Sequence, residues 1–239
     1  MYTTTGSTGG YLLYLIISLP ALLLGLWAQL KIKSSFSKYS KVRTTSGMTG
    51  AEVARRMLDQ YGLTNVRIEE VAGTLSDHYD PQAKVLRLSQ GVYRSISVAA
   101  AGVAAHECGH AIQDFEKYGP LKIRSLMVPS VKLGSWLGPI LFMVGLFFNS
   151  MTGDNIAIAG LLLFSATALF AIVTLPVEFN ATKRAKAWLS DSGIIYSGEM
   201  AGVNKVLDSA ALTYVAGAAQ ALSTILYYAM ILTGRSSRD

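Results

Sequence analysis

Cysteine and histidine are scarce in this sequence. The 239 residues include one cysteine, Cys108, and three histidines. A single cysteine excludes a disulfide within the chain, and a reducing compartment therefore suits the polar part of the protein. Three histidines leave few candidates for imidazole ligands, so a metal site must be built from very few positions.

Charged residues are also few. They make up 15% of the chain, whereas 51% of it is apolar and the mean hydropathy is +0.37, values that indicate a membrane protein. Residues 1–30 contain no charged side chain, and residues 31–130 contain 14 basic and 9 acidic ones. The net charge of +6 comes without a nucleic-acid-binding motif and is explained by basic residues that flank membrane segments. We therefore expect no nucleic-acid partner.

Long uncharged runs are present in place of charge. Four of them can cross about 30 Å of hydrocarbon, which takes about 20 helical residues. They lie at residues 11–30, 133–153, 155–177 and within 209–234. The first run has no basic residues before it, which favours a retained anchor over a cleaved signal peptide. The fourth run is rich in small and polar residues, so it either spans the membrane or packs beside it. Residues 1–10 are predicted to form a flexible tail.

Positive charge follows particular runs and so predicts an orientation. Five basic residues and no acidic one lie within residues 31–43, directly after the first run, and three basic residues lie within 183–186, after the third. By the positive-inside rule, residues 31–132 and 178–208 face the cytoplasm and the N-terminus faces outside. The C-terminus would also face outside, although Arg235 and a second arginine near the chain end weigh against this.

The polar segment is predicted to fold as a small α+β unit. Thr49 and Glu52 form a capping-box pattern that predicts a short helix. Two strands follow, "NVRIEEV" and "AKVLRLS", joined by the loop "AGTLSDHYDPQ". A second helix, from near Ser95 to Gly119, begins with small side chains that allow close packing, and its Cys108 is expected to be a packed thiol. About 80 residues are few for an independent core, so this unit is expected to pack on the membrane spans or on the later helix.

The stretch "VAAHECGHAIQD" contains the pattern H-E-x-x-H. On a helix, His106 and His110 share one face about 6 Å apart. Two imidazoles placed in this way can bind one zinc ion at about 2.0–2.1 Å each. Glu107 is rotated by about 100° from His106 and so suits a general base that reaches a water molecule rather than a third ligand. The pattern therefore predicts one catalytic zinc ion.

A third ligand must come from elsewhere in the chain, because the extension H-x-x-G-x-x-H is absent. The candidates are His78 and Glu178. Glu178 directly follows the third apolar run, where a carboxylate is costly unless paired or metal-bound, and Pro176 beside it suits the opening of a new helix. Topology places Glu178 on the same side as the histidines, so we expect it to be the third ligand. Asp114, one turn past His110, better suits an orienting partner.

Four stretches together resemble one known family. They are "LSDHYDPQAKVLRLS", "AAHECGHAIQD", "LPVEFNATKRA" and "KVLDSAALTYVA", in matching order over roughly residues 45–230. The resemblance is to the YugP-like neutral zinc metallopeptidases of bacterial membranes. It implies a membrane gluzincin in the bacterial plasma membrane, with His106, His110 and Glu178 as zinc ligands and Glu107 as the catalytic acid and base.

The resemblance leaves some roles open. Related membrane gluzincins carry an aspartate four residues after the third ligand, where this chain has Thr182, so Asn180, Thr182 and Asp114 are all candidates for the orienting partner. His78 then either lines the cleft, where it would donate to the oxyanion as a further catalytic residue, or shapes a turn. Arg184 either stabilises the oxyanion or extends to the membrane interface, and we favour the interface.

The predicted fold is a mainly α, multi-span membrane protein with a small α+β zincin-like cytoplasmic domain. The predicted function is a zinc-dependent endopeptidase embedded in the lipid bilayer, with protein or peptide substrates that are either membrane or soluble proteins. An extended substrate would add to the strand "AKVLRLS". The alternative is a non-catalytic zinc-binding scaffold or chaperone-like protein. A transporter is disfavoured, because none of the four runs contains an ionisable residue in mid-span.

Overall fold

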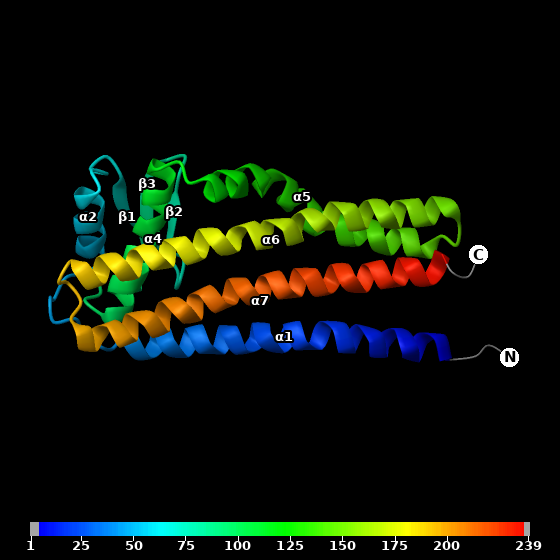
Figure 1. Cartoon of the computed structure of the whole chain (residues 1–239), viewed down its shortest axis with the longest axis horizontal. Helices are drawn as coiled ribbons and strands as arrows, with labels where there is room; N and C mark the ends of the chain where they lie inside the picture. Colours follow the sequence, from blue (N-terminus) through cyan, green and yellow to red (C-terminus); the bar gives the residue numbers. More distant parts are fainter. Residues whose placement is uncertain (1–4, 237–239) are drawn as a thin grey trace. The chain divides into compact units, whose positions relative to one another are not determined.

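The computed structural model describes the backbone of residues 5–236 and the side chains of residue 12 and residues 15–235. It is mainly helical, and four helices are long and apolar enough to cross a membrane. These helices are α1 (Thr5–Tyr39), α5 (Gly119–Phe147), α6 (Met151–Asp191) and α7 (Ser197–Ser236) (Figure 1). Three of the predicted runs each lie within one of these helices, whereas the run at 133–153 extends past the end of α5 and through the turn into the start of α6. Residues 1–4 lie outside the described part, and the flexible tail predicted for residues 1–10 stays a prediction.

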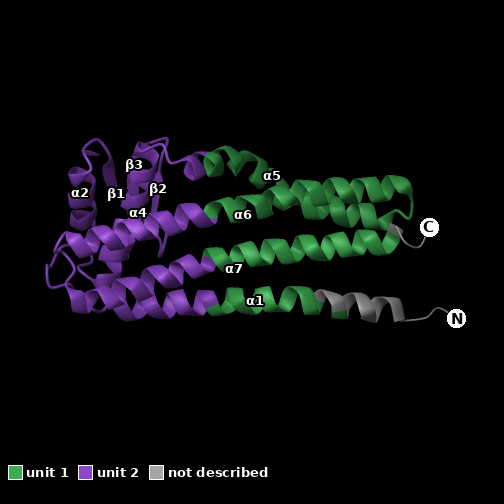
Figure 2. Ribbon diagram, in the orientation of Figure 1, with its two compact units in different colours: residues 1–27, 123–174, 214–239 green, residues 28–122, 175–213 purple. Residues whose placement is uncertain are grey.

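The chain divides into two compact units (Figure 2). Unit 1 comprises residues 1–27, 123–174 and 214–239, and unit 2 comprises residues 28–122 and 175–213. All four long helices contribute residues to both units. The metal-binding candidates all belong to unit 2.

Glycines bring α5 and α6 together in unit 1. A side-chain carbon built at Gly138 would lie 2.9 Å from the backbone nitrogen of Phe164 and 3.0 Å from the carbonyl oxygen of Gly160. Phe142 of α5 is fully buried and stacks on Tyr228 of α7 with ring centroids 3.9 Å apart. Such close backbone approach is typical of helices that associate in a membrane.

Unit 2 contains a three-stranded sheet. Its strands are β1 (Arg67–Val71), β2 (His78–Asp80) and β3 (Val85–Ser89), in the order β1-β3-β2. β3 pairs with β1 in parallel and with β2 in antiparallel register. Both predicted strands are present as β1 and β3, but β2 lies in the stretch predicted as a loop. Because β3 is central, both of its edges are occupied, and the expectation that a substrate strand adds to it is wrong.

Three shorter helices pack with this sheet. They are α2 (Gly50–Gln60), α3 (Gln90–Tyr93) and α4 (Val98–Phe115). The predicted capping box of α2 is present, with Thr49 and Glu52 each bonded to the other's backbone N–H. Helix α4 is shorter than predicted and is capped by Ser97, whose hydroxyl accepts a hydrogen bond from the N–H of Ala100.

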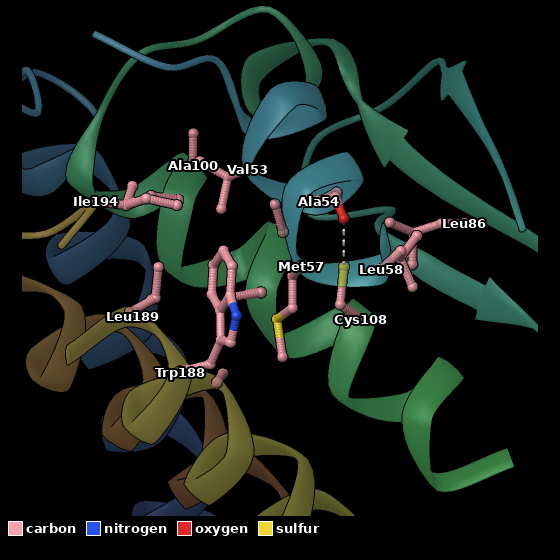
Figure 3. Close-up of a cluster of buried hydrophobic side chains, with 14 of the residues drawn as sticks. Val53, Ala54, Met57, Leu58, Leu86, Ala100, Cys108, Trp188, Leu189 and Ile194 are labelled. Carbon is pink, nitrogen blue, oxygen red and sulfur yellow. Dashed lines mark hydrogen bonds between the residues drawn. The ribbon is translucent and has the colours of Figure 1, made fainter. Parts of the chain in front are cut away.

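The core of unit 2 lies between α2, α4 and the later part of α6 (Figure 3). Met57 and Leu58 of α2 are fully buried, and Trp188 of α6 reaches the same cluster. Cys108 of α4 is also fully buried, with its sulfur 3.6 Å from the carbonyl oxygen of Ala54, and burial raises the pKa of its thiol. The expectation of a packed thiol is confirmed.

Helix α6 continues through Pro176 as far as Asp191. The prediction that a new helix opens at Pro176 is therefore wrong. A proline inside a helix removes one backbone hydrogen bond, and neighbouring helices make this tolerable in membrane proteins. As a result Glu178 lies inside a long helix rather than in its first turn.

Candidate metal centre

His106 and His110 lie one turn apart on α4, as the H-E-x-x-H spacing predicts. Their ring centroids are 4.9 Å apart and the ring planes are nearly perpendicular. Both side chains are largely buried, with 12% and 11% exposed. Helical periodicity therefore brings two imidazoles to one sheltered point.

Glu178 of α6 meets both histidines at that point. Its Oε2 atom lies 3.2 Å from Nε2 of His106 and 3.5 Å from Nε2 of His110, and the side chain is 1% exposed. Potential ligand atoms of the three residues all lie within 4.8 Å of one another. Tetrahedral zinc with bonds of about 2.0–2.1 Å places neighbouring ligand atoms about 3.3–3.4 Å apart. The spacing of these three residues fits one zinc ion.

His78, the rival candidate, is not part of this cluster. It is the first residue of β2 and is exposed, and its Nδ1 atom lies 2.8 Å from the carbonyl oxygen of Ser76. This short-range contact belongs to the turn that leads into β2. Its predicted catalytic role stays a prediction.

The other ring nitrogen of each histidine contacts a neutral polar group. Nδ1 of His106 lies 3.2 Å from the hydroxyl of Thr182, which is one of the predicted orienting partners. Nδ1 of His110 lies 3.0 Å from Oε1 of Gln113. Such partners fix the orientation of an imidazole and decide which nitrogen faces a metal.

Asp114 does not orient either histidine, contrary to one of the expectations. Its carboxylate accepts hydrogen bonds from the hydroxyl of Tyr79 and the ammonium of Lys84, which joins α4 to the sheet. The burial of Tyr79 and its bond to this carboxylate raise the pKa of the phenol. Helix spacing showed that Asp114 shares a face with His110 but not which residues of the sheet would reach it.

The sequence interpretation missed Gln113. It is fully buried, although glutamine is mostly exposed in proteins. Its Nε2 atom donates to the carbonyl of Val177 and to Oδ1 of Asn180, both on α6. Gln113 follows an alanine and an isoleucine on the helix that carries His110. This position could have indicated a buried amide, and a buried amide requires hydrogen-bond partners.

Gly109 lets α4 and α6 approach closely at the site. A side-chain carbon built there would lie 2.9 Å from the carbonyl oxygen and 3.0 Å from the Cα atom of Ala181. Gly109 lies between His106 and His110 on α4, and Ala181 lies between Glu178 and Thr182 on α6. The distance between the ligand-bearing helices thus depends on one missing methyl group.

Glu107 is buried beside the three candidate ligands, with 9% of the residue exposed. Burial raises the pKa of its carboxyl group, and the two neighbouring histidines oppose this only in part. The negative charges of Glu178 and Asp77 add to the rise. A carboxyl group that holds its proton more tightly than usual suits transfer of a proton.

Arg184 makes contacts that the sequence did not predict, and its two candidate roles stay predictions. Its guanidinium forms two hydrogen bonds, of 2.9 and 2.6 Å, to the carboxylate of Glu116, and its Nε atom donates to Oδ1 of Asn180 at 2.7 Å. The side chain is 22% exposed. Arg184 therefore joins the end of α4 to α6.

Comparison with known proteins agrees with the geometry of the site. Residues 14–233 match the model of a family described as "putative neutral zinc metallopeptidase". The chain is 49% identical over 225 residues to a protein of Bacillus subtilis strain 168 that is named "putative membrane protease YugP", and the match covers 94% of this chain and 99% of that relative. No solved structure matches the chain significantly.

Proposed function

The chain belongs to the neutral zinc metallopeptidase family, and from this membership we propose that it is a membrane-embedded zinc endopeptidase of the gluzincin type. His106, His110 and Glu178 bind the zinc ion, and Glu107 is the general base and acid. The observation that carries the proposal is the convergence of two Nε2 atoms on one carboxylate oxygen, at 3.2 and 3.5 Å.

That convergence is costly without a cation. If both Nδ1 atoms donate to Thr182 and Gln113, each neutral imidazole directs a lone pair from Nε2 toward the carboxylate of Glu178. Three lone pairs that face one another repel in a buried place unless a cation lies among them. Zinc at this point supplies a Lewis acid that polarises the scissile carbonyl and lowers the pKa of the attacking water.

Glu107 accepts the proton of that water and then delivers it to the leaving amine. The peptide bond is hydrolysed without an acyl-enzyme. Glu107 follows His106 directly on α4, so its side chain lies beside the ligand cluster and does not complete it. This division of roles explains why an acid stands between the two histidines.

Strand β2 is the strand that an extended substrate can join. It is at the edge of the sheet, paired only with β3 among the described residues. It also packs against α4, the helix that carries Glu107. Backbone pairing with β2 would hold an extended peptide next to the proposed zinc ion with little demand on side-chain identity, and His78 would then contact the peptide.

We place the catalytic residues on the cytoplasmic side of a four-span protein. The basic residues after the first and third runs support this orientation. Arg235, which weighed against an external C-terminus, donates hydrogen bonds to Asp154 and to the carbonyls of Leu146 and Phe148 at the turn between α5 and α6. Its charge is therefore balanced by Asp154, and the objection loses force.

Glu107→Gln tests the proposal against a zinc-binding scaffold, which has no use for a general base. The variant keeps its shape, so we expect zinc bound per protein to be unchanged and cleavage of a casein-type substrate to fall at least about 100-fold. Metal analysis and the cleavage assay on protein in bilayers measure both. Glu69→Gln, in β1, is the matched control and should keep full activity. Wild-type cleavage in Glu107→Gln would show that the proposed mechanism is wrong.

A further inference from the structure

Four polar side chains extend from the candidate metal centre along α4 and α6. Gln113 contacts His110, Asn180 contacts Gln113, Arg184 contacts Asn180, and Glu116 contacts Arg184. Gln113 is fully buried. Its amide oxygen contacts His110, and its amide nitrogen donates to Val177 and Asn180. None of these four side chains is among the proposed zinc ligands.

Arg184 fixes which atom donates and which accepts in each hydrogen bond between it and His110. A guanidinium can only donate, so the atom of Asn180 that faces Arg184 at 2.7 Å is its oxygen. The Nε2 atom of Gln113 lies 3.0 Å from that oxygen of Asn180 and 2.8 Å from the carbonyl oxygen of Val177. Both are acceptors, so the amide nitrogen of Gln113 must point toward them.

The amide oxygen of Gln113 is then left to face His110. An oxygen accepts, so Nδ1 of His110 must carry the hydrogen, and the Nε2 lone pair of the neutral ring points to Glu178. That is the tautomer that a zinc ligand bound through Nε2 requires. A flipped Gln113 would place its NH₂ against Nδ1 and favour the opposite tautomer.

We infer that Gln113, Asn180 and Arg184, with Arg184 held by Glu116, are positioning residues that set the tautomer of His110 for metal binding. The inference rests on the proposed zinc site. The salt bridge between Arg184 and Glu116 joins α6 to the end of α4. The contacts that hold these two helices together therefore also orient His110. His106 has no comparable device, because the hydroxyl of Thr182 can either donate or accept.

The tautomer can be measured without zinc. The chain has three histidines, so full-length protein with ¹⁵N-labelled histidine in lipid bilayers gives three ring systems, assigned with His78→Gln and His106→Gln variants. Chelator-treated protein, at a pH high enough that the ¹⁵N shifts show a neutral ring, should show His110 protonated at Nδ1. Gln113→Leu should give mixed tautomers. Gln113→Glu should give more of the Nδ1–H form than Gln113→Leu, because its carboxylate still accepts from Nδ1 even though it loses the N–H that donates to Val177 and Asn180.

Zinc affinity is the second readout, by competition with a chromogenic chelator. Gln113→Leu should weaken zinc binding about 10- to 100-fold, the usual effect of losing a partner of a ligand histidine. Arg184→Met should weaken it by a smaller factor, because Asn180 then loses its fixed orientation. Arg87→Met is the matched control: Arg87 is 27% exposed and also pairs with carboxylates, but contacts no proposed ligand in the described part of the chain, so its affinity should stay within about twofold.

Several outcomes would overturn the inference. If Gln113→Leu keeps the Nδ1–H form of His110 and zinc affinity within twofold, the side chain does not set the tautomer. If Gln113→Leu and Gln113→Glu behave alike, Gln113 acts only by packing α4 on α6. If Arg184→Met matches Arg87→Met, the series ends at Gln113.

Failure of the inference and failure of the proposed function give different results. If the tautomer depends on Gln113 as expected but Glu107→Gln cleaves at the wild-type rate, the positioning role stands and the proposed mechanism falls. If Glu107→Gln is inactive but the tautomer of His110 is independent of Gln113, the peptidase stands and the positioning role falls.

Discussion

The two units bury different kinds of groups. Among the largest fully buried side chains of the described residues, Phe142 belongs to unit 1 and all the others, including Leu58 and Leu189, belong to unit 2. Unit 1 instead exposes large apolar side chains, such as Leu162 with 68% and Phe147 with 84% exposed, and brings helices together at glycines. Unit 2 buries a polar hydrogen-bonded network as well as an apolar core.

The difference follows from the solvent that each unit would meet. In water, burial of apolar area is the main stabilising term, so unit 2 gathers leucine, methionine and alanine inside. In lipid, outward apolar side chains cost nothing, and helices associate through close backbone contact. The proposed metal site lies in the unit that is able to bury and satisfy polar groups, and four sets of substitutions test this contrast.

The largest effect is expected for Glu178→Ala. It removes one of three proposed ligands. Roughly 10–16 kcal/mol shared among the four ligands of a structural zinc site is about 2.5–4 kcal/mol for each, so affinity should fall at least about 70-fold. Metal analysis of the purified protein measures this. His78→Ala should keep its zinc. The reverse pair of results would make His78 the third ligand.

Leu58→Ala and Leu162→Ala compare burial in the two units with the same chemical change. Leu58 is fully buried in unit 2, so its truncation should lower the free energy of unfolding by about 2–5 kcal/mol. Leu162 is 68% exposed in unit 1, and its truncation should cost less than about 0.5 kcal/mol in bilayer or detergent. Denaturant-induced unfolding measures both. Equal costs would contradict the contrast between the units.

Gly109→Ala and Gly138→Ala each add a methyl group where two helices meet. At Gly109 the added carbon would press on Ala181 and move α4 away from α6, so zinc affinity should fall about 10-fold. At Gly138 it would press on Phe164, lowering the thermal midpoint but leaving zinc affinity unchanged. Gly198→Ala, with no atom within 4 Å of the added carbon, is the control. A loss of zinc affinity in Gly138→Ala would contradict the assignment of the site to unit 2 alone.

The smallest effect is a pH dependence at Asp80. Hydrogen bonds from the Ala83 N–H and from Arg87 lower the pKa of this carboxyl group to about 2. A lowered pKa in the folded state stabilises above the ordinary value near 3.9 and is lost as pH falls toward 2. The thermal midpoint of Asp80→Asn should therefore lie slightly below wild type at pH 6 and equal it at about pH 2. A difference that persists at pH 2 would point to another cause.

Local patterns in the sequence carried the correct predictions. The capping box of α2, the strands β1 and β3 and the common face of His106 and His110 depend on residues within a few positions of one another. Glu178 was chosen over His78 from the cost of a carboxylate beside an apolar run and from charge placement. The structure brings Glu178, and not His78, to the two histidines.

The wrong predictions share a different cause. Strand β2 has three residues and exists only because β3 lies beside it, so its own sequence reads as a turn. Pro176 resembles a helix start, but the neighbouring contacts of α6 sustain the helix through it. Asp114 has the right spacing to orient His110, but its carboxylate instead accepts hydrogen bonds from Tyr79 of β2 and from Lys84, directly before β3.

By itself the sequence determined the apolar runs, the H-E-x-x-H helix face and the position of Glu107, the proposed general base, beside it, because each depends on helix periodicity or on length. Only the tertiary structure decided that Gln113 and Thr182 contact the histidines, that Gly109 sets the spacing of α4 and α6, and that the polar series ends at Arg184 and Glu116. Apart from the contact of Gln113 with His110, three residues before it, these are pairings between segments about 70 residues apart. Hydrogen bonds at that separation depend on how two helices are brought together, which no local pattern encodes.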